Sequence, residues 1–392
     1  MGASLSGLGY NCAMRSDGLP KPTFVDTPEK FKNMIQALMK EPVIAVDTES
    51  NSLFAYRERV CLIQFSIPNR DYLVDPFALE DLSSLAPVFA SQQIEKIFHA
   101  AEYDIIILHH DFEFEFSNLF DTMVAARILG WKAVGLGSIL KDQFGIQVEK
   151  KYQRANWGKR PLTKDMLTYA QLDTHYLIAL RGRIKSELDK TGRWPLAEED
   201  FKRACHVNSS HQERDGADCW RINGARDLPP HKQAVLHEIC KYRDQVARSM
   251  DRPLFKVISN NTLYNIAEAC PRSMRELEDV DGLSHKQARW LGRGLLAAVQ
   301  EGLNAGHPPK LPHKSRPSDA YLFRVDKLRQ WRKKRARSMG VESDVVLPKD
   351  LLYQLAEDNP RTLNQFDEIL ESVPWRREQF GDQIFNLLIS EQ

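Results

Sequence analysis

The chain has 392 residues and a formal net charge of +1, and 42% of the residues are hydrophobic and 27% charged. This length predicts two or three domains rather than one core, and the composition is typical of a soluble globular protein. The nearly balanced charge excludes binding to nucleic acid through the field of the whole molecule, so any such affinity must come from local patches.

The cysteines, the hydropathy and the N-terminal segment give no sign of a disulfide-rich, zinc-binding, membrane-spanning or secreted protein. None of the six cysteines forms a Cys-x-x-Cys pair, which indicates reduced thiols rather than a zinc site or a disulfide framework. No apolar run is long enough to span a bilayer, and residues 1–20 lack the charged start and apolar core of a secretory signal. We therefore expect a cytoplasmic protein without membrane attachment, in which residues 1–23 form a disordered leader.

Residues 24–205 predict one α/β domain with a mixed sheet and flanking helices. Thr27-Pro28-Glu29 begins a helix with an apolar face, and Pro68-Asn69-Arg70 separates two strand-like runs by a turn. The expected strands are 43–47, 60–66, 71–75, 96–99 and 118–121, with the first three in an antiparallel meander. The expected helices begin near residues 28 and 104 and cover 122–129, 137–144 and 163–188.

Four acidic residues and a tyrosine fall in three short motifs of this domain. Asp47 and Glu49 lie two residues apart at the end of an expected strand, so both carboxylates leave the same face. Asp104 lies at the start of an expected helix. Tyr169 and Asp173 are four residues apart in an expected helix and therefore share a face. This layout predicts that the five side chains meet across one cleft.

Each of these residues has a structural explanation when it is taken alone. Asp104 could cap its helix, Asp47 could be a turn residue, and Asp173 could be a solvated helix acid. Tyr169 could pack on the sheet. The joint pattern favours a functional site, because converging carboxylates repel one another strongly unless cations lie between them.

Carboxylates are the ligands of hard divalent ions, and the chain has no Cys/His cluster to suggest zinc. Two Mg²⁺ or Mn²⁺ ions roughly 4 Å apart would neutralise a phosphodiester and stabilise its departing 3′ oxygen. We expect Asp47, Glu49, Asp104 and Asp173 to be the ligands, directly or through water. Tyr169 would hydrogen-bond and orient the attacking water. Since an ordinary tyrosine has a pKa of about 10, removal of the proton of the water by Tyr169 would need help from the metal ions, and the alternative is a positional role alone.

The motifs resemble those of the DEDD exonuclease superfamily, in the branch with a tyrosine in the third motif, and within it the ribonuclease D family. The resemblance covers about residues 24–190. It extends to Arg59-Val-Cys-Leu-Ile-Gln64, Val74-Asp75-Pro76, Phe120-Asp121-Thr122 and Asn156-Trp-Gly-Lys-Arg-Pro-Leu-Thr163. It implies a ribonuclease H-like fold and 3′→5′ hydrolysis of RNA.

Three residues near the motifs are weaker candidates for substrate contact. His99 ends an expected strand, and it either contacts the substrate or closes the strand. Gln64 ends the stretch that resembles the second strand of the family. Arg160 matches an arginine of the family and belongs to a basic segment for which phosphate contact and a solvated loop are both open.

The second half of the chain contains an internal repeat, since residues 235–300 and 324–389 align without a gap at an offset of 89. Both copies show short amphipathic helices with proline breaks and resemble HRDC domains, which are nucleic-acid-binding modules. We expect helical domains at 220–303 and 318–392, joined by an extended Pro-rich linker at 304–317. Two such domains after a DEDD domain resemble the bacterial ribonuclease D arrangement.

The second copy begins with a strongly basic segment. Residues 324–337 contain eight basic residues and one acid, interleaved with Trp331. On a helix, Arg332, Lys333 and Arg335 would form a positive surface with an aromatic ring available for stacking on RNA. The alternative is a solvated helix face without a ligand.

Together these patterns predict a metal-dependent 3′→5′ exoribonuclease that releases 5′-mononucleotides from RNA 3′ ends. The resemblance implies tRNA precursors as the substrate class, and we expect a monomer. A DNA exonuclease or proofreading module with the same site stays open, because no residue is assigned to the 2′-hydroxyl. A non-catalytic RNA-binding scaffold also stays open, although the complete motif set argues against it.

Overall fold

The computed structural model describes residues 19–206, 219–308 and 317–389. Most of the expected leader (1–23) and most of the expected linker (304–317) therefore lie outside the described residues. The chain divides into two compact units. The first comprises residues 1–49, 60–208 and 316–392, and the second comprises residues 50–59 and 209–315.

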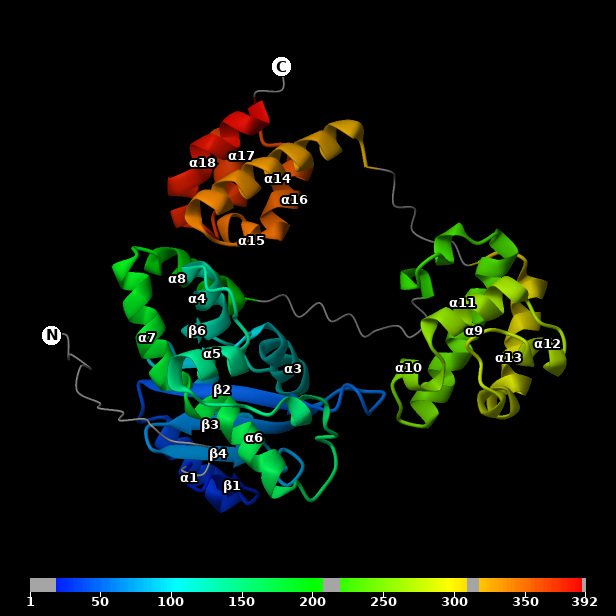
Figure 1. Ribbon diagram of the computed structural model, residues 1–392, viewed down its shortest axis with the longest axis horizontal. Coiled ribbons are helices and arrows are strands. Elements are labelled where there is room, and N and C mark those ends of the chain that lie inside the picture. The colour runs from blue at the N-terminus through cyan, green and yellow to red at the C-terminus, as the bar shows by residue number, and fades with distance from the viewer. Residues whose placement is uncertain (1–18, 207–218, 309–316, 390–392) are drawn as a thin grey trace. The chain divides into compact units, whose positions relative to one another are not determined.

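A six-stranded sheet forms the centre of the first unit, with the strand order β1-β4-β3-β2-β5-β6 (Figure 1). The β3–β4 pair is antiparallel, whereas β1–β4, β2–β5 and β5–β6 are parallel, so the sheet is mixed as predicted. The strands are β1 (Thr23–Val25), β2 (Val43–Ser50), β3 (Val60–Ile67), β4 (Arg70–Val74), β5 (Glu95–Phe98) and β6 (Leu119–Asp121).

Two strands differ from the expectation. The three-residue edge strand β1 was not predicted, because so short a segment has no readable alternation and gains its hydrogen bonds from β4. Strand β2 continues past Asp47 to Ser50, so Asp47 and Glu49 lie within the strand rather than at its end.

The predicted helices of this domain are present with one correction, and two further helices, at 86–90 and 194–204, were not predicted. The predicted helix 163–188 is two helices, which meet at Tyr176. The ring of Tyr176 packs 5.6 Å from that of Phe144, a tertiary contact that no helix-breaking residue announces. The helices are α1 (Pro28–Leu38), α2 (Ala86–Ala90), α3 (Glu102–Phe112), α4 (Thr122–Leu129), α5 (Leu136–Phe144), α6 (Lys164–His175), α7 (Leu177–Lys190) and α8 (Trp194–Ala204).

The internal repeat forms two small helical domains with five α-helices each in the same order, as predicted. The first copy contains α9 (Pro230–Ser249), α10 (Leu254–Val257), α11 (Asn260–Ala269), α12 (Met274–Glu278) and α13 (His285–Ala305). The second contains α14 (Asp319–Met339), α15 (Ser343–Val346), α16 (Lys349–Asp358), α17 (Leu363–Ile369) and α18 (Pro374–Ile389). Each copy has its own apolar core. None of the helices in the described ranges has the length and apolarity that a membrane span requires.

Candidate active site

The first two acidic residues are presented by β2, which lies between β3 and β5 in the sheet. Its first half is buried and apolar, since Ile44, Ala45 and Val46 are fully inaccessible. Asp47 and Glu49 follow on alternate positions and therefore leave the strand on the same face. The central strand thus holds two carboxylates on a rigid base.

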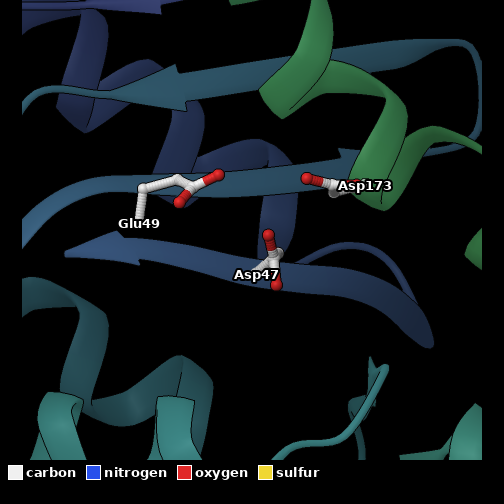
Figure 2. A group of neighbouring side chains, drawn as sticks. All are labelled: Asp47, Glu49 and Asp173. Atoms are coloured by element: carbon white, nitrogen blue, oxygen red, sulfur yellow. The ribbon is translucent and has the colours of Figure 1, made fainter. Parts of the chain in front are cut away.

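Helix α6 brings the third motif to this face. The helix begins after Thr163, whose side chain accepts a hydrogen bond from the backbone of Met166. Tyr169 and Asp173 share a helix face, and the Tyr169 hydroxyl donates a hydrogen bond to Asp173. The carboxylate oxygens of Asp47, Glu49 and Asp173 lie within 4.8 Å of one another, and Figure 2 shows the three side chains pointing toward one region from β2 and α6.

Asp104 lies in the first turn of α3, outside this group of three, but its charge contributes to the raised pKa values of Asp47, Glu49 and Asp173. It is buried and accepts a hydrogen bond from the hydroxyl of Thr48, the residue between the two acids of β2. The start of α3 is held by Asp121, whose carboxylate accepts hydrogen bonds from the backbone N–H groups of Ala100 and Ala101 at 3.1 and 2.7 Å. Asp121 also caps α4, so one buried carboxylate fixes two helix starts.

Burial and repulsion by nearby carboxylates raise the pKa of these four carboxyl groups, and the carboxylate that repels Asp104 is Asp121. Burial is the larger cause for Asp104 and Asp173, and each pKa is raised to about 7. The pKa values of Asp47 and Glu49 are raised well above their ordinary range, first by burial and then by the neighbouring carboxylates. Burial and the nearby acids also raise the pKa of Tyr169, so its hydroxyl keeps its proton.

This donor set fits a hard divalent cation. The ligand atoms are carboxylate oxygens from rigid elements, and no lysine or arginine forms an ion pair with them within the described ranges. Both amide atoms of the fully buried Gln64 also lack a hydrogen-bond partner among the described residues. Gln64 lies on the face of β3 that turns toward α6, because Leu62 packs with Tyr169 and Ser66 contacts Thr174 on either side of it. A hydrated ion would give such an amide its missing partners.

The weaker candidates for substrate contact fall into different surroundings. Gln64 has no exposed surface and cannot touch an RNA strand in this conformation. The Nδ1 atom of His99 lies 2.9 Å from the hydroxyl oxygen of Thr122, and burial lowers the pKa of the imidazole. A neutral, anchored His99 matches the interpretation that it closes the strand.

Arg160 is engaged by the protein itself. Its guanidinium donates two hydrogen bonds of 2.7 Å to the carboxylate of Asp75 and a third of 2.7 Å to the backbone oxygen of Cys61. The guanidinium also lies 4.7 Å from the centre of the Phe77 ring. These bonds tie the segment before α6 to the sheet, so Arg160 has a structural role in this conformation.

Of the three candidates on α14, two contact other parts of the protein and one is exposed. Arg332 donates to the backbone oxygen of Leu347, and Arg335 lies over the ring of Phe380. Lys333 alone of the three is exposed. Trp331 is not free for stacking, because it packs edge-on against Phe380 at 5.9 Å.

A second basic face was not anticipated from the sequence. On α13 of the first helical domain, Lys286, Arg289, Trp290 and Arg293 are exposed and follow the spacing i, i+3, i+4, i+7, which places them on one helix face. Trp290 is 49% exposed. That spacing is the signal that could have revealed this face, which the denser run at 324–337 overshadowed.

Comparison with known proteins agrees with this layout. A family model described as 3′-5′ exonuclease matches residues 22–189, and the HRDC domain model matches residues 232–299 and 322–388. The chain is 28% identical over 91% of its length to the protein named ribonuclease D of Nitrobacter hamburgensis, of which it covers 93%. It is 31% identical to the exosome complex exonuclease RRP6 of Saccharomyces cerevisiae, but spans only 36% of that protein.

Solved structures show the same fold. The crystal structure of Escherichia coli RNase D matches with a TM-score of 0.71 at 23% identity, covering 95% of this chain and all of that chain. The catalytic core of RRP6 from Trypanosoma brucei matches with a TM-score of 0.62 at 28% identity, covering 73% of this chain and 80% of that one. With a 3′-5′ exonuclease domain, two HRDC domains and full-length similarity to ribonuclease D, the chain belongs to the ribonuclease D family of 3′→5′ exoribonucleases.

Proposed function

We propose that the enzyme removes nucleotides from RNA 3′ ends with two divalent ions, Mg²⁺ or Mn²⁺, and that tRNA precursors are its substrates. Asp47, Glu49, Asp104 and Asp173 would hold the ions. The observation that carries this proposal is the half-buried group of carboxylates, in which one oxygen each of Asp47, Glu49 and Asp173 lies within 4.8 Å of the others. When bound, the ions supply charge neutralisation of the phosphodiester and stabilisation of the departing 3′ oxygen.

Tyr169 orients the attacking water in this proposal. Its raised pKa keeps the phenol protonated, so the hydroxyl donates to Asp173 and its oxygen is left to accept a hydrogen bond from the water. Without bound cations the phenol is therefore a poor general base at neutral pH. The expected contribution of Tyr169 is therefore orientation of the nucleophile rather than removal of its proton.

The proposal is tested by product analysis on matched RNA and DNA oligonucleotides with and without Mg²⁺ or Mn²⁺. Wild type should release 5′-mononucleotides from RNA, and Asp47→Asn should lower kcat at least about a thousandfold, as loss of a group that acts only in the transition state does. Asp189→Asn is the matched control, because Asp189 is an exposed acid on α7 that pairs only with Lys185. Equal cleavage by Asp47→Asn would refute the site, and equally fast degradation of DNA would refute the preference for RNA. Labelled tRNA precursors compared with unstructured RNA would test the substrate class.

We also propose that RNA is bound by the exposed α13 face of the first helical domain, which is formed by Lys286, Arg289, Trp290 and Arg293. Three cations with an exposed indole suit the phosphates and bases of a single strand. The repeat supports a division of roles, because the offset of 89 replaces Lys286, Arg289, Trp290 and Arg293 by Trp375, Glu378, Gln379 and Asp382. The charge of this face is thus reversed in the second copy.

Binding of RNA to the inactive Asp47→Asn protein, measured at several salt concentrations, tests this surface. Removing Arg289 and Arg293 together should weaken RNA binding. The slope of log K against log salt concentration should become less steep by about 0.7 for each phosphate contact that is lost. Trp290→Ala should weaken binding by about 1–3 kcal/mol with no change in that slope. Glu378→Ala on the corresponding face of α18 is the control. Unchanged affinity in all of these α13 variants would exclude the surface.

A monomeric, cytoplasmic enzyme completes the proposal. No disulfide joins the five cysteines that the structure describes, which suits a reducing compartment. Light scattering on the purified protein and cell fractionation would test the two statements.

A further inference from the structure

A buried polar network lies beneath the C-terminal end of α6. Its centre is Asp71, the second residue of β4, which is 3% exposed. Ser66 on β3 is the direct cross-strand partner of Asp71, and its hydroxyl donates to Asp71 Oδ1 at 2.6 Å. The sheet therefore presents a carboxylate to α6 whose position is fixed by strand pairing.

Three side chains near the end of α6 converge on this pair. Gln171 Nε2 donates to Asp71 Oδ2 at 2.6 Å, and His175 Nδ1 lies 2.8 Å from the same oxygen. The Thr174 hydroxyl lies 2.7 Å from that of Ser66. The three helix residues occupy positions i, i+3 and i+4, so one side of the helix is hydrogen-bonded to one point of the sheet.

We propose that Asp71 is a positioning residue for the reaction, which sets the rotation and axial position of α6 and thereby places Asp173 and Tyr169. This inference rests on the proposed roles of Asp173 and Tyr169. Both residues lie on the same rigid helix as Gln171 and His175, and Asp173 stands between them in sequence. Since successive helix residues are about 100° apart, a small rotation moves the Asp173 carboxylate sideways relative to β2.

The other side-chain hydrogen bonds of this region act mostly at the opposite end of α6. The Thr163 cap and the Arg160–Asp75 bonds hold the N-terminal end of the helix. At the C-terminal end the helix stops at His175, and the chain changes direction at Tyr176 before α7 begins. Asp173 lies in this last turn, where the bonds to Asp71 act together with the buried side chains of Leu172 and Tyr176 and with a bond from Gln171 Nε2 to the backbone oxygen of Pro20. Displacement of a reacting group by about 1 Å can reduce a rate a hundredfold.

The test compares Asp71→Asn with the double variant Asp71→Asn/Gln171→Glu. In the single variant, the amide oxygen can accept from Gln171 only when the amide nitrogen faces Ser66, so the network loses its charge and one of its two acceptor oxygens. In the double variant, the amide introduced at position 71 can donate to the carboxylate introduced at position 171, which keeps a bond between the two positions and restores the net charge. His175→Ala and His175→Asn form a milder pair, because an asparagine amide can reproduce the donor at Nδ1.

The readouts are kcat and KM on an RNA oligonucleotide, Mg²⁺ binding by calorimetry without RNA, and the thermal midpoint. We expect Asp71→Asn to lower kcat and Mg²⁺ affinity about 10–100-fold, as loss of a residue that orients metal ligands does. KM for RNA should change less than about threefold, because the residue acts on the metal ligands rather than on RNA binding. The double variant should recover most of the loss. His175→Ala should show the same pattern at smaller size, with recovery in His175→Asn.

Two results would overturn the inference. One is unchanged kcat and Mg²⁺ affinity per folded enzyme while only the thermal midpoint falls, which would mean that the network is merely structural. The other is equal loss in the single and double variants together with equal loss in both His175 variants. If Asp71→Asn does not fold, the His175 pair decides. Asp47→Asn is measured in parallel: if it retains full activity, the proposed metal site has failed, whatever the Asp71 variants show. Glu199→Gln, which changes a buried acid of α8, is the control and should leave kcat unchanged.

Discussion

At the scale of single residues, the site is a group of like charges that the fold holds together at an energetic cost. Asp47, Glu49, Asp104 and Asp173 all have raised pKa values because burial and repulsion from neighbouring carboxylates disfavour their ionised forms. A protein without cations therefore carries electrostatic strain at neutral pH. This strain is the physical signature of a site that is complementary to positive charge.

The stability of the metal-free enzyme should therefore depend on pH in a defined direction. The pKa of Asp104 is raised from 3.8 to about 7, so folding favours its protonated form. Its stabilising contribution is complete below about pH 4 and is lost as the pH rises through 7. In EDTA, the thermal midpoint should fall from pH 5 to pH 8, and Mg²⁺ should restore it most strongly at pH 8. A midpoint that Mg²⁺ leaves unchanged at pH 8 would contradict the assignment of a metal site.

Replacing Asp104 by asparagine should separate stability from activity. The neutral amide removes one repelling charge and still accepts the hydrogen bond from Thr48. Unfolding in urea with EDTA should show a gain of about 2–4 kcal/mol at pH 8, the equivalent of up to three pKa units, whereas nuclease activity should be lost. The gain should shrink at pH 5. A loss of stability at pH 8 would show that Asp104 is held in its ionised form.

At the scale of elements, sequence patterns reveal helices and strands but not the contacts that align them. Gly302 of α13 illustrates this point. An added Cβ would lie 2.3 Å from the Cα atom of Val235 on α9, so the two helices pack backbone against backbone. In the sequence Gly302 is only a poor helix former, whereas in the structure it permits this close approach within the first helical domain.

Gly302→Ala should therefore destabilise the first helical domain by more than about 2 kcal/mol, because backbone atoms cannot yield as side chains do. Gly182→Ala is the matched control, since nothing lies within 4 Å of the added Cβ on α7. The control should be stabilised by about 0.5–1 kcal/mol through helix propensity. Urea unfolding of both variants measures the difference. A neutral Gly302→Ala would mean that α9 and α13 can separate without cost.

At the scale of the whole molecule, the two copies of the repeat have different roles. The second copy belongs to the same compact unit as the nuclease domain. Arg376 at the start of α18 is 1% exposed and pairs with Glu199 and Asp200 of α8 at 2.9 Å. Arg127 of α4 pairs with Glu342 and Asp344 at 2.6 Å. The second copy is thus a structural extension of the nuclease domain, whereas the first copy carries the exposed α13 face.

Arg376 and its neighbour Arg377 should behave very differently when they are replaced by methionine. Arg376→Met leaves Glu199 buried without its cation and should cost about 3–5 kcal/mol in urea unfolding. Arg377→Met removes pairs with the exposed residues Asp367 and Asp382 and should cost at most about 1 kcal/mol. If Arg376→Met costs as little as Arg377→Met, the ion pairs between α8 and α18 contribute nothing to folding.

Local patterns along the chain were enough to predict the chemistry and the modular plan. Asp47, Glu49, Asp104, Tyr169 and Asp173 follow the spacing rules of strands and helices, and the repeat is visible because it is gapless, so both could be predicted with the mixed α/β fold. Contacts between elements emerged only from the folded chain. The predicted helix 163–188 is interrupted at Tyr176. Arg160 is bound by Asp75 rather than free for RNA, and Asp71 lies beneath α6, where it accepts a hydrogen bond from Gln171. Such hydrogen bonds join residues up to about a hundred positions apart, and no periodicity along the chain encodes which distant carboxylate a buried donor will meet.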